Sequence, residues 1–471
     1  MAADVVLVNP FPNAAGTNDV TVQAPMGLLY IASSLESRGY SCNLVDANAL
    51  KLDDEHAVSL CLKEDPLLVG MHVNALNFQA AMRYSRIIKE QGPKIKIVFG
   101  GPHATASAQA CLAPGTVDGV VCAEGERICV DIIGRIKKNA HPFEGLLGVC
   151  YMDNGAFVRN PPAERIEDID NLPIPAYHLL PGLNNYKTRV RRWPFMGIIT
   201  SRGCPYRCSF CSKDIFGTKI TLRSPENVVS EIEFLIRSMG IRQIDILDDN
   251  FTFDRQRCEN ICRLLIKKSL PVILNLQSGV RTETIDKEML ILLKKAGVFK
   301  IAFGVESGDE DILRAVDKRV NLDQIRKTVK LARQTGMVTI GFFMLGLPYD
   351  TEHSMQKTID IAKELNCHIA NFMITIPFYG TPLYDLVQEK GRMLVDTREG
   401  ISSGFYGGKA FFEFQGMTAG MVEHYYKKAY RDFYNRPSKL MDILSTIRSF
   451  GELRWLLEAG FSIIASGIKK G

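Results

Sequence analysis

Three cysteines stand close together near the middle of the chain. Cys204, Cys208 and Cys211 follow one another at the spacing C-x3-C-x2-C. Cysteine thiolates hold iron–sulfur clusters, and a cluster with four irons normally takes about four of them. Three ligands on one loop would therefore bind three irons and leave the fourth open to another molecule. Gly203 and Pro205 suit a loop that must wrap closely around such a cluster.

A zinc site is the main alternative for these cysteines. Zinc would need a fourth protein ligand, usually from a second closely spaced pair of cysteines or histidines. No such pair follows in the sequence. Cys258 and Cys262 lie four residues apart on an amphipathic helical pattern, where cysteines act as small apolar core residues. The same interpretation is given to Cys367 and to the cysteines nearer the N-terminus, so the spacing favours the cluster.

Composition and length indicate an ordinary globular protein with room for two or three domains. The 471 residues are 46% hydrophobic and 23% charged, which excludes disordered and fibrous classes. The net charge of +5 is small for this length and gives no argument for nucleic-acid binding. Twelve cysteines without a secretory leader predict a reducing cytoplasm. No apolar run reaches the roughly 18 residues that a membrane span needs.

Residues 1–145 alternate strand and helix patterns. Such alternation predicts an α/β domain with a doubly wound, Rossmann-like parallel sheet. Ligands of these sheets bind outside the carboxyl ends of the strands. The candidate binding residues in the loops there are Asn9, Pro10, Asn74, Gly100, Gly101, His103, Glu124 and Gly125. Taken alone, the two adjacent glycines are better explained by a tight turn.

Residues 146–189 form a junction. A β-hairpin is expected over 148–158, with its turn at Asp153, Asn154 and Gly155. Proline density and loss of periodicity then predict an extended linker between domains.

Residues 190–390 repeat a strand followed by a helix about six times. The expected strands cover 195–200, 243–247, 272–277, 300–304, 339–345 and 370–376, and the expected helices cover 225–237, 255–267, 283–296, 322–334 and 352–365. Repeated β/α units predict a complete or partial parallel barrel with its chemistry at the carboxyl ends of the strands.

Polar residues follow several of these strands. Asp248 and Asp249 end the second strand, where they are interpreted as ligand contacts, because Asp254 can cap the next helix without them. Arg281 follows the third strand and could pair with an acid or lie on the surface. Glu306 lies within an apolar run at the end of the fourth strand and therefore needs a partner.

Residues 391–471 are expected to form a C-terminal helical domain. A segment rich in glycine and aromatic residues, including Phe405 and Tyr406, could line a pocket or cover the barrel mouth. The last stretch places basic residues among apolar ones, which suits either internal packing or contact with a membrane interface. Its residues include Arg448, Arg454, Trp455, Leu456, Phe461, Ile463, Ile464, Lys469 and Lys470.

The cysteine motif, with Phe210 in its aromatic place, resembles the signature of the radical S-adenosylmethionine (SAM) enzymes. The resemblance implies a [4Fe–4S] cluster that cleaves SAM to a 5′-deoxyadenosyl radical within a partial (β/α)6 barrel. It also implies SAM contacts at Phe210, Asp248, Asp249, Arg281 and Glu306, and at Gly346, where adenine would lie against the backbone. A flavodoxin or ferredoxin is the expected electron donor.

The first domain, with its Gly100-Gly101 turn and the Glu124-Gly125 segment, resembles the cobalamin-binding domain of B12-dependent radical SAM enzymes. The branch that the chain resembles contains the anaerobic magnesium-protoporphyrin ester cyclase. One departure is the missing D-x-H-x-x-G motif, whose histidine binds cobalt: His56 lacks the glycine after it and is interpreted as part of a solvated helix start. The resemblance therefore implies cobalamin bound without a histidine ligand.

Three functions follow from these resemblances. The first is methylation of an unactivated carbon in a natural-product or lipid-like small molecule, with cytoplasmic localisation and peripheral membrane contact. The second is a radical cyclisation or rearrangement without methyl transfer. The third is a radical SAM enzyme whose first domain binds no B12. The sequence identifies neither the substrate nor a catalytic residue.

Overall fold

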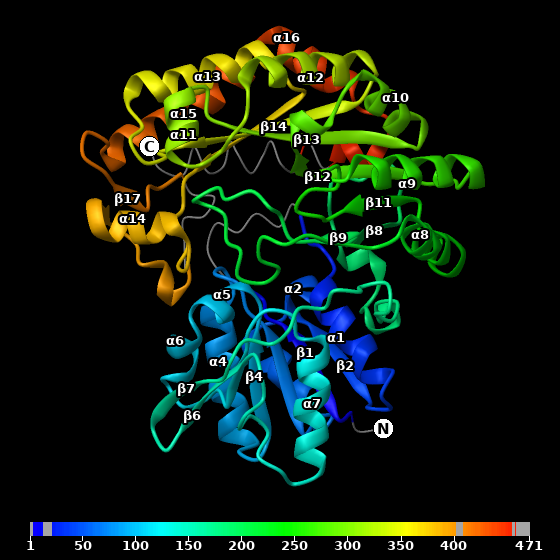
Figure 1. Ribbon diagram of the computed structural model, residues 1–471, viewed down its shortest axis with the longest axis vertical. Coiled ribbons are helices and arrows are strands. Elements are labelled where there is room, and N and C mark those ends of the chain that lie inside the picture. The colour runs from blue at the N-terminus through cyan, green and yellow to red at the C-terminus, as the bar shows by residue number, and fades with distance from the viewer. Residues whose placement is uncertain (1–2, 13–20, 402–407, 455–456, 458–471) are drawn as a thin grey trace.

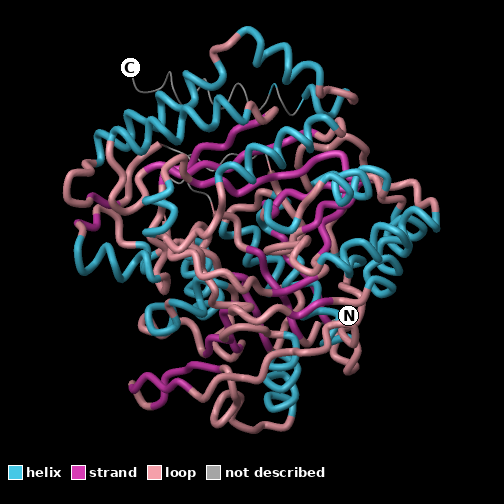
Figure 2. Tube along the Cα trace, turned by 45° about the horizontal axis from the view of Figure 1, so that its top comes forward, coloured by secondary structure: helices cyan, strands magenta, loops and turns pink. Residues whose placement is uncertain are grey.

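The computed structural model describes residues 3–12, 21–401, 408–454 and 457. Two main β-sheets, each with helices packed against it, form two domains that lie one above the other in Figure 1. Figure 2 shows the helices arranged around the strands. The predicted α/β architecture, with a Rossmann-like domain and a radical SAM barrel, is confirmed. Phe405, Tyr406, Trp455, Leu456, Phe461, Ile463, Ile464, Lys469 and Lys470 lie outside the described residues.

The first sheet has seven strands in the order β2-β1-β3-β4-β5-β6-β7. The first five strands are parallel. Successive strands are added on one side of β1 and then on the other, so the strand order switches between β1 and β3, where doubly wound sheets bind ligands. The strands are β1 (Val5–Asn9), β2 (Cys42–Asp46), β3 (Leu68–His72), β4 (Lys96–Gly100), β5 (Gly119–Val121), β6 (Val149–Asp153) and β7 (Ala156–Arg159).

The predicted hairpin is present but lies in the first sheet instead of standing apart in the junction. β6 pairs antiparallel with β5, with Val121 opposite Val149, and β7 pairs with β6. Strand β5 is short and would leave backbone groups unpaired at the edge of the sheet, and the hairpin forms hydrogen bonds with them. The sequence does not reveal this pairing, because it is long-range.

Helices cover both faces of the first sheet. One face carries α1 and α7, and the other carries α3 and α4, which contact each other. The core under α1 continues into the second domain, so the two domains share apolar packing. The helices are α1 (Met26–Glu36), α2 (Ala47–Leu50), α3 (Asp54–Leu62), α4 (Phe78–Gln91), α5 (Pro102–Ala106), α6 (Ala108–Leu112) and α7 (Glu126–Lys137).

The second sheet is an open, six-stranded parallel sheet in the order β15-β14-β13-β12-β11-β8. Neighbours in space are neighbours in sequence, as right-handed β/α repeats require. The strands are β8 (Phe195–Ile198), β11 (Gln243–Ile246), β12 (Ile273–Val280), β13 (Val298–Glu306), β14 (Val338–Leu345) and β15 (Ile369–Ile374).

Helices cover the face of this sheet that points away from the first domain (Figure 1). Asp254 caps the second of them by accepting a hydrogen bond from Arg257 N, as predicted. The helices are α8 (Pro225–Met239), α9 (Arg255–Lys268), α10 (Lys287–Lys295), α11 (Glu310–Ala315), α12 (Leu322–Gln334) and α13 (Glu352–Leu365).

The C-terminal segment contains α14 (Pro382–Lys390), α15 (Ala419–Tyr434) and α16 (Pro437–Ser445), with a small hairpin of β16 (Arg392–Met393) and β17 (Phe412–Glu413). Helix α15 packs on α13 and β15. Gly400 and Ile401 contact Ala75 of the first domain, so this segment ties the two domains together. None of the helices in the described part of the chain combines the length and apolar character that a membrane span requires.

Candidate active site

The cysteine loop leaves the second sheet after β8. Its ends are held together by antiparallel strands β9 (Ser201–Arg202) and β10 (Thr221–Leu222), which close residues 203–220 into a loop. Gly203 has a φ of +88°, and a Cβ there would collide with the carbonyl oxygen of Lys219. Only glycine therefore suits this turn, as the sequence predicted.

The loop is anchored on the carboxyl ends of the barrel strands. Ser209 N donates to the Val316 carbonyl at 3.0 Å, and Leu383 N donates to the Ser209 carbonyl at 3.0 Å. Phe210, predicted as a SAM contact, packs against an apolar cluster formed by Ile312, Val316, Met344 and Leu347. The aromatic residue thus fixes the loop on the barrel.

Two of the three thiols, those of Cys208 and Cys211, have both cations and carboxylates near them. Cys208 is buried and Cys211 is exposed, while Cys204 is half-buried. Desolvation raises the pKa of the Cys208 and Cys211 thiols, and cations oppose it: Lys318 and Arg281 at Cys208, and Lys213 at Cys211. Neighbouring cations favour the thiolate, which is the form that binds iron.

The donor set suits a cluster better than a single metal ion. Among the described residues, no three His, Cys, Asp or Glu side chains converge as ligands of one ion would. In a cluster each thiolate binds a different iron, so its ligands need not meet at one point. The loop therefore fits a [4Fe–4S] cluster on Cys204, Cys208 and Cys211.

A buried ion pair stands beside the cysteine loop. Glu306, with a φ of +67°, forms a 2.9 Å ion pair with Lys318, and both side chains are about nine-tenths buried. The partner that Glu306 was predicted to need is thus a lysine that sequence reasoning missed. Gly304 lies against this pair, because an added Cβ would be 2.7 Å from Glu306 Oε1 and 2.9 Å from Lys318 Nζ.

Arg281 is buried at the end of β12, so the surface alternative is wrong. Its guanidinium lies 3.6 Å from the ring centroid of Tyr206 in the cysteine loop and 3.2 Å from Glu283 Oε1. It also donates a hydrogen bond to the Arg319 carbonyl. Arg281 therefore stacks on the loop that carries the cysteines.

The two predicted aspartates differ in role. Both oxygens of buried Asp248 accept hydrogen bonds from the protein, from Thr200 N at 2.6 Å and from the Ser201 hydroxyl at 2.7 Å. Asp248 therefore fixes the chain that leads into the cysteine loop. Asp249 is exposed, and desolvation combined with the neighbouring Asp248 carboxylate raises its pKa although Lys213 opposes the shift. Asp249 is the carboxylate left available to a ligand.

Gly346, predicted to let adenine lie against the backbone, has a role in packing. Its φ is +75°, and the position of its missing side chain is filled by Val422 of α15, which would lie 2.8 Å from an added Cβ. Packing of α15 therefore requires this glycine, and its contact with adenine stays a prediction. This long-range contact has no signal in the local sequence.

At the first domain, several predicted cobalamin contacts are engaged within the protein. Asn9 donates to Asp46 at 2.9 Å, and Asn74 accepts from Leu76 N at 2.9 Å. An added Cβ at Gly101 would be 2.7 Å from the Val73 carbonyl, so backbone packing requires this glycine. Gly125 is similarly close to Ile31, and Pro10 is buried. These positions shape the edge of the sheet.

Two features of that edge fit a bulky ligand. A side chain at Gly100 would make only ordinary contacts with this protein, the nearest atom being 3.7 Å away, so internal packing does not explain the glycine. His103 is 6% exposed, and its ring lies 4.6 Å from that of Phe78 at an angle of 54°. Its Nε2 atom is buried without a hydrogen-bond partner among the described residues. Close backbone approach and an unpaired polar atom are expected where a cofactor enters.

Replacing His103 by glutamine is expected to make the protein less sensitive to acid. Burial lowers the pKa of His103 to about 4, from about 6.5 for an exposed histidine. Between these values the unfolded chain binds a proton that the folded protein does not, so stability is complete above the upper value and falls below it. The loss is about 2 kcal/mol by roughly pH 5. Thermal midpoints at neutral and acidic pH measure it, with exposed His56→Gln as control; equal acid sensitivity of H103Q and wild type would contradict the assignment.

A buried ion triad joins the two domains beside the cysteine loop. Arg202, two residues before Cys204, forms 2.6 Å ion pairs with Glu124 and with Glu126 of the first domain, and all three side chains are buried. Glu124 also accepts a hydrogen bond from Ile166 N at 2.9 Å. Glu124, predicted as a cobalamin contact, is therefore occupied by the interface; the guanidinium that occupies it was not foreseen.

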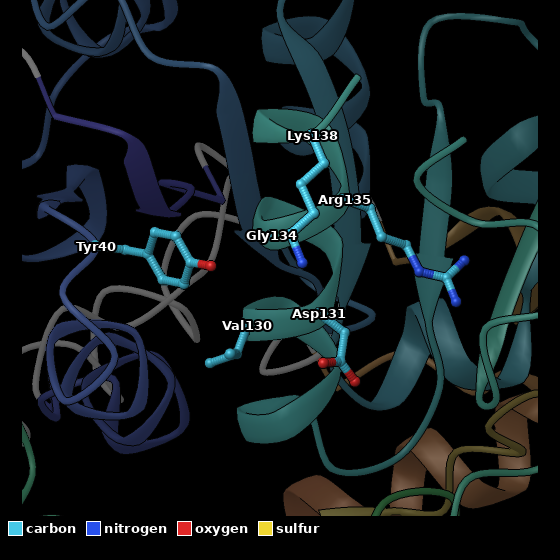
Figure 3. A pocket seen from close by; sticks show the side chains of 6 residues that line it. All are labelled: Tyr40, Val130, Asp131, Gly134, Arg135 and Lys138. Atoms are coloured by element: carbon cyan, nitrogen blue, oxygen red, sulfur yellow. The ribbon is translucent and has the colours of Figure 1, made fainter. Parts of the chain in front are cut away.

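A surface pocket of about 370 Å³ lies on the first domain (Figure 3). Tyr40 forms one side and residues of α7 form the other, including Asp131, Arg135 and Lys138. None of the predicted site residues lines it. The predicted site residues therefore lie elsewhere, several of them where the two domains meet.

Comparisons with known proteins agree with both halves of the site. Residues 198–362 match the radical SAM superfamily, and residues 14–133 match the B12 binding domain. The chain therefore carries a radical SAM domain and an N-terminal B12-binding domain. Its cofactors are a [4Fe–4S] cluster, SAM and cobalamin, as the sequence predicted.

The proteins that the chain is similar to include enzymes that catalyse different reactions. An uncharacterized methyltransferase of Pyrococcus horikoshii is 29% identical over 423 residues, 89% of this chain and 90% of the relative. The anaerobic magnesium-protoporphyrin IX monomethyl ester cyclase of Rubrivivax gelatinosus is 27% identical, over 82% of this chain and 70% of the cyclase. The fold resembles that of the radical SAM methyltransferase TsrM from Kitasatospora setae, with a TM-score of 0.71, 19% identity and full coverage of both chains.

Proposed function

We propose that the protein methylates an unactivated carbon of an apolar, natural-product or lipid-like small molecule. When bound, the cluster and SAM supply hydrogen-atom abstraction, and the corrinoid supplies the methyl group. The protein itself must hold the two cofactor-binding loops at a fixed separation and exclude water from the space between them.

The observation that carries this proposal is the meeting of the two strand edges. Glu124, after β5, pairs with Arg202, just before the cysteines. Ala106, after β4, lies 3.1 Å from the position of a Cβ on Gly380, which follows β15. Ala75, after β3, accepts a hydrogen bond from Ile401 N at 2.7 Å. Two loops of the B12-binding edge thus contact the barrel mouth and a third contacts the C-terminal segment, so a substrate between the domains would be within reach of both cofactors.

Anaerobic reconstitution with iron, sulfide and hydroxocobalamin tests the proposal. The protein should retain a corrinoid, seen in its optical spectrum, and should pass the labelled methyl group of SAM to a component of a small-molecule extract. Loss of the corrinoid on gel filtration would rule the proposal out. The cyclase relative supports one rival, a cyclisation without methyl transfer, and a new product without the label would favour that rival.

Alanine in place of Gly304 is expected to weaken SAM binding without loss of the cluster. The added Cβ would displace the ion pair between Glu306 and Lys318, and we assign Glu306 as a SAM contact. A lost hydrogen bond to a charged group corresponds to about tenfold weaker binding or more. Titration of the reconstituted protein with SAM, followed by the electron paramagnetic resonance of the cluster, measures the change.

Gly27→Ala is the matched control, since an added Cβ at Gly27 meets nothing within 4 Å. Unchanged SAM affinity in the Gly304→Ala protein would remove Glu306 from the SAM site.

The proposal includes an electron donor and a membrane contact. A flavodoxin or ferredoxin would deliver single electrons to the cluster, and the exposed position of Cys211 supports access from outside. Leu440, Met441 and Leu444 of α16 are between 47% and 67% exposed, which supports peripheral contact with a membrane through the C-terminal helices.

A further inference from the structure

The inner face of the barrel sheet, opposite its helices, is divided into a polar and an apolar half. Side chains alternate along strands, and the outward set, such as Ile244, Leu274 and Ile301, belongs to the core under the helices. The residues between them point inward. On β11, β12 and β13 they include Asp245, Asn275, Gln277 and Lys300. On β14 and β15 they include Ile340, Phe342, Ile369 and Met373, with Asn371 as the one polar side chain between the last two.

Three of the polar residues form a row across adjacent strands, the polar row. Asp245 is opposite Asn275 in the strand register, and Asn275 is opposite Lys300. Asp245 and Asn275 are fully buried, and Lys300 is 3% exposed. The interior of a parallel barrel is ordinarily filled by branched apolar side chains, so a charged row there requires an explanation.

The polar row is only partly satisfied by the protein. Asp245 accepts hydrogen bonds from Gln243 at 2.9 Å and from Gln23 of the first domain at 3.4 Å. Asn275 Oδ1 and Gln23 Oε1 are buried without a hydrogen-bond partner among the described residues. The Lys300 ammonium lies 5.7 Å from the Phe299 ring centroid, and no described residue forms a hydrogen bond or ion pair with it.

Burial lowers the pKa of the Lys300 ammonium to about 8, although the Asp245 carboxylate opposes this shift. Such a shift is expected for an ammonium that lacks a close acceptor. Unpaired buried polar atoms in a native protein indicate bound water or a ligand. The segment that contains Arg189 and Arg191 closes the barrel at the amino end of β11. There Gln243 donates a hydrogen bond to the Arg189 carbonyl and accepts one from Arg191 N.

The apolar half starts directly beside this row. Ala302, two residues after Lys300, forms a cluster with Ile340, Ile369 and Phe342 that is separate from the core under the helices. Met373, at the far edge, is 38% exposed although it lies within a strand. Gly279 and Gly304 lack side chains on the same face: an added Cβ at Gly279 would meet Phe342 at 3.6 Å, and the space at Gly304 is taken by the ion pair of Glu306 and Lys318.

We infer that the inner face binds an amphipathic substrate whose uncharged polar group, a hydroxyl or a primary amide, contacts Lys300 and Asn275 while its apolar body lies on β14 and β15. Such a group accepts from the ammonium and donates to the free carbonyl oxygen. A carboxylate would face Asp245 and two carbonyl oxygens, and an amine would face Lys300, so both should be disfavoured. The inference rests on the proposed function, whose substrate it defines further.

Four chain-matched probes test the inference on the reconstituted holoenzyme: octan-1-ol, octanamide, octanoate and octylamine. Titration by saturation-transfer NMR should give octanamide and octan-1-ol affinities at least about tenfold higher than those of octanoate and octylamine. Ala302→Phe should abolish binding of all four, since the larger side chain would stand between the polar row and the apolar half. Lys300→Met should remove the preference, and Lys287→Met on the exposed surface of α10 should not.

Should Lys300→Met fail to fold, the double variant with Asp245→Asn removes both charges and keeps the row neutral. Binding of octanoate as tight as that of octanamide, no binding of any probe, or affinities unchanged by Ala302→Phe would each overturn the inference. Corrinoid retention and SAM cleavage by the same samples are measured alongside. If these are intact while the probes fail, the inference alone is wrong.

Discussion

Replacing any one of Cys204, Cys208 and Cys211 by alanine is expected to abolish the iron–sulfur absorbance and reductive cleavage of SAM. Each thiolate holds a different iron, so the loss of one leaves a second iron open and the cluster unstable. The loop has no spare ligand, because Cys258, Cys262 and Cys367 are buried in the core. Absorbance of the reconstituted protein and chromatography of the SAM products measure both losses.

Cys258→Ala is the matched control for these variants. It removes a buried thiol on α9 that contacts Met289 Sδ at 3.8 Å and lies outside the cysteine loop. We expect a loss of about 1 kcal/mol in unfolding free energy and a normal cluster. A cluster that survives in any of the three loop variants, with SAM cleavage retained, would contradict the assignment of that cysteine.

The order of strands and helices could be predicted from the sequence because it depends on local patterns. The barrel strands are short runs rich in apolar residues, and each barrel helix begins at a capping residue such as Asp254 or Thr351. The cysteine loop could be predicted for the same reason: its three ligands lie within eight residues of one another.

The partners of the charged residues could not be predicted in this way. Lys318 pairs with Glu306 across a helix, and Arg202 meets Glu124 and Glu126 from another domain, so neither pair has a fixed sequence spacing. Sequence reasoning marked Glu124 and Asp248 as ligand contacts because polar residues at strand ends often bind ligands. The protein's own donors occupy both carboxylates, which is a property of tertiary structure.

Replacing Arg202 by methionine is expected to destabilise the protein by about 3–5 kcal/mol, since it leaves two buried carboxylates without their cation. The guanidinium also lies 5.1 Å from the ring centroid of Tyr30 in the first domain and 5.2 Å from that of Phe216 in the cysteine loop. Both domains therefore lose contacts in this variant. Thermal and urea unfolding measure the loss. The control is Arg255→Met, which removes an ion pair with Asp286 at the surface and should cost less than about 1 kcal/mol.

The triple variant Arg202→Met, Glu124→Gln, Glu126→Gln separates stability from positioning. Removing all three charges should restore most of the lost stability, because the cost arises from the uncompensated carboxylates. Cluster and corrinoid should then bind as in the wild type, each within its own domain. Methyl transfer should nevertheless remain low, because the cation that held the B12-binding edge against the cysteine loop is gone and the reacting groups lose their fixed separation. Full activity in a stable triple variant would contradict this role of Arg202. It would mean that the apolar core shared by α1 and the barrel is sufficient to hold the two domains in position.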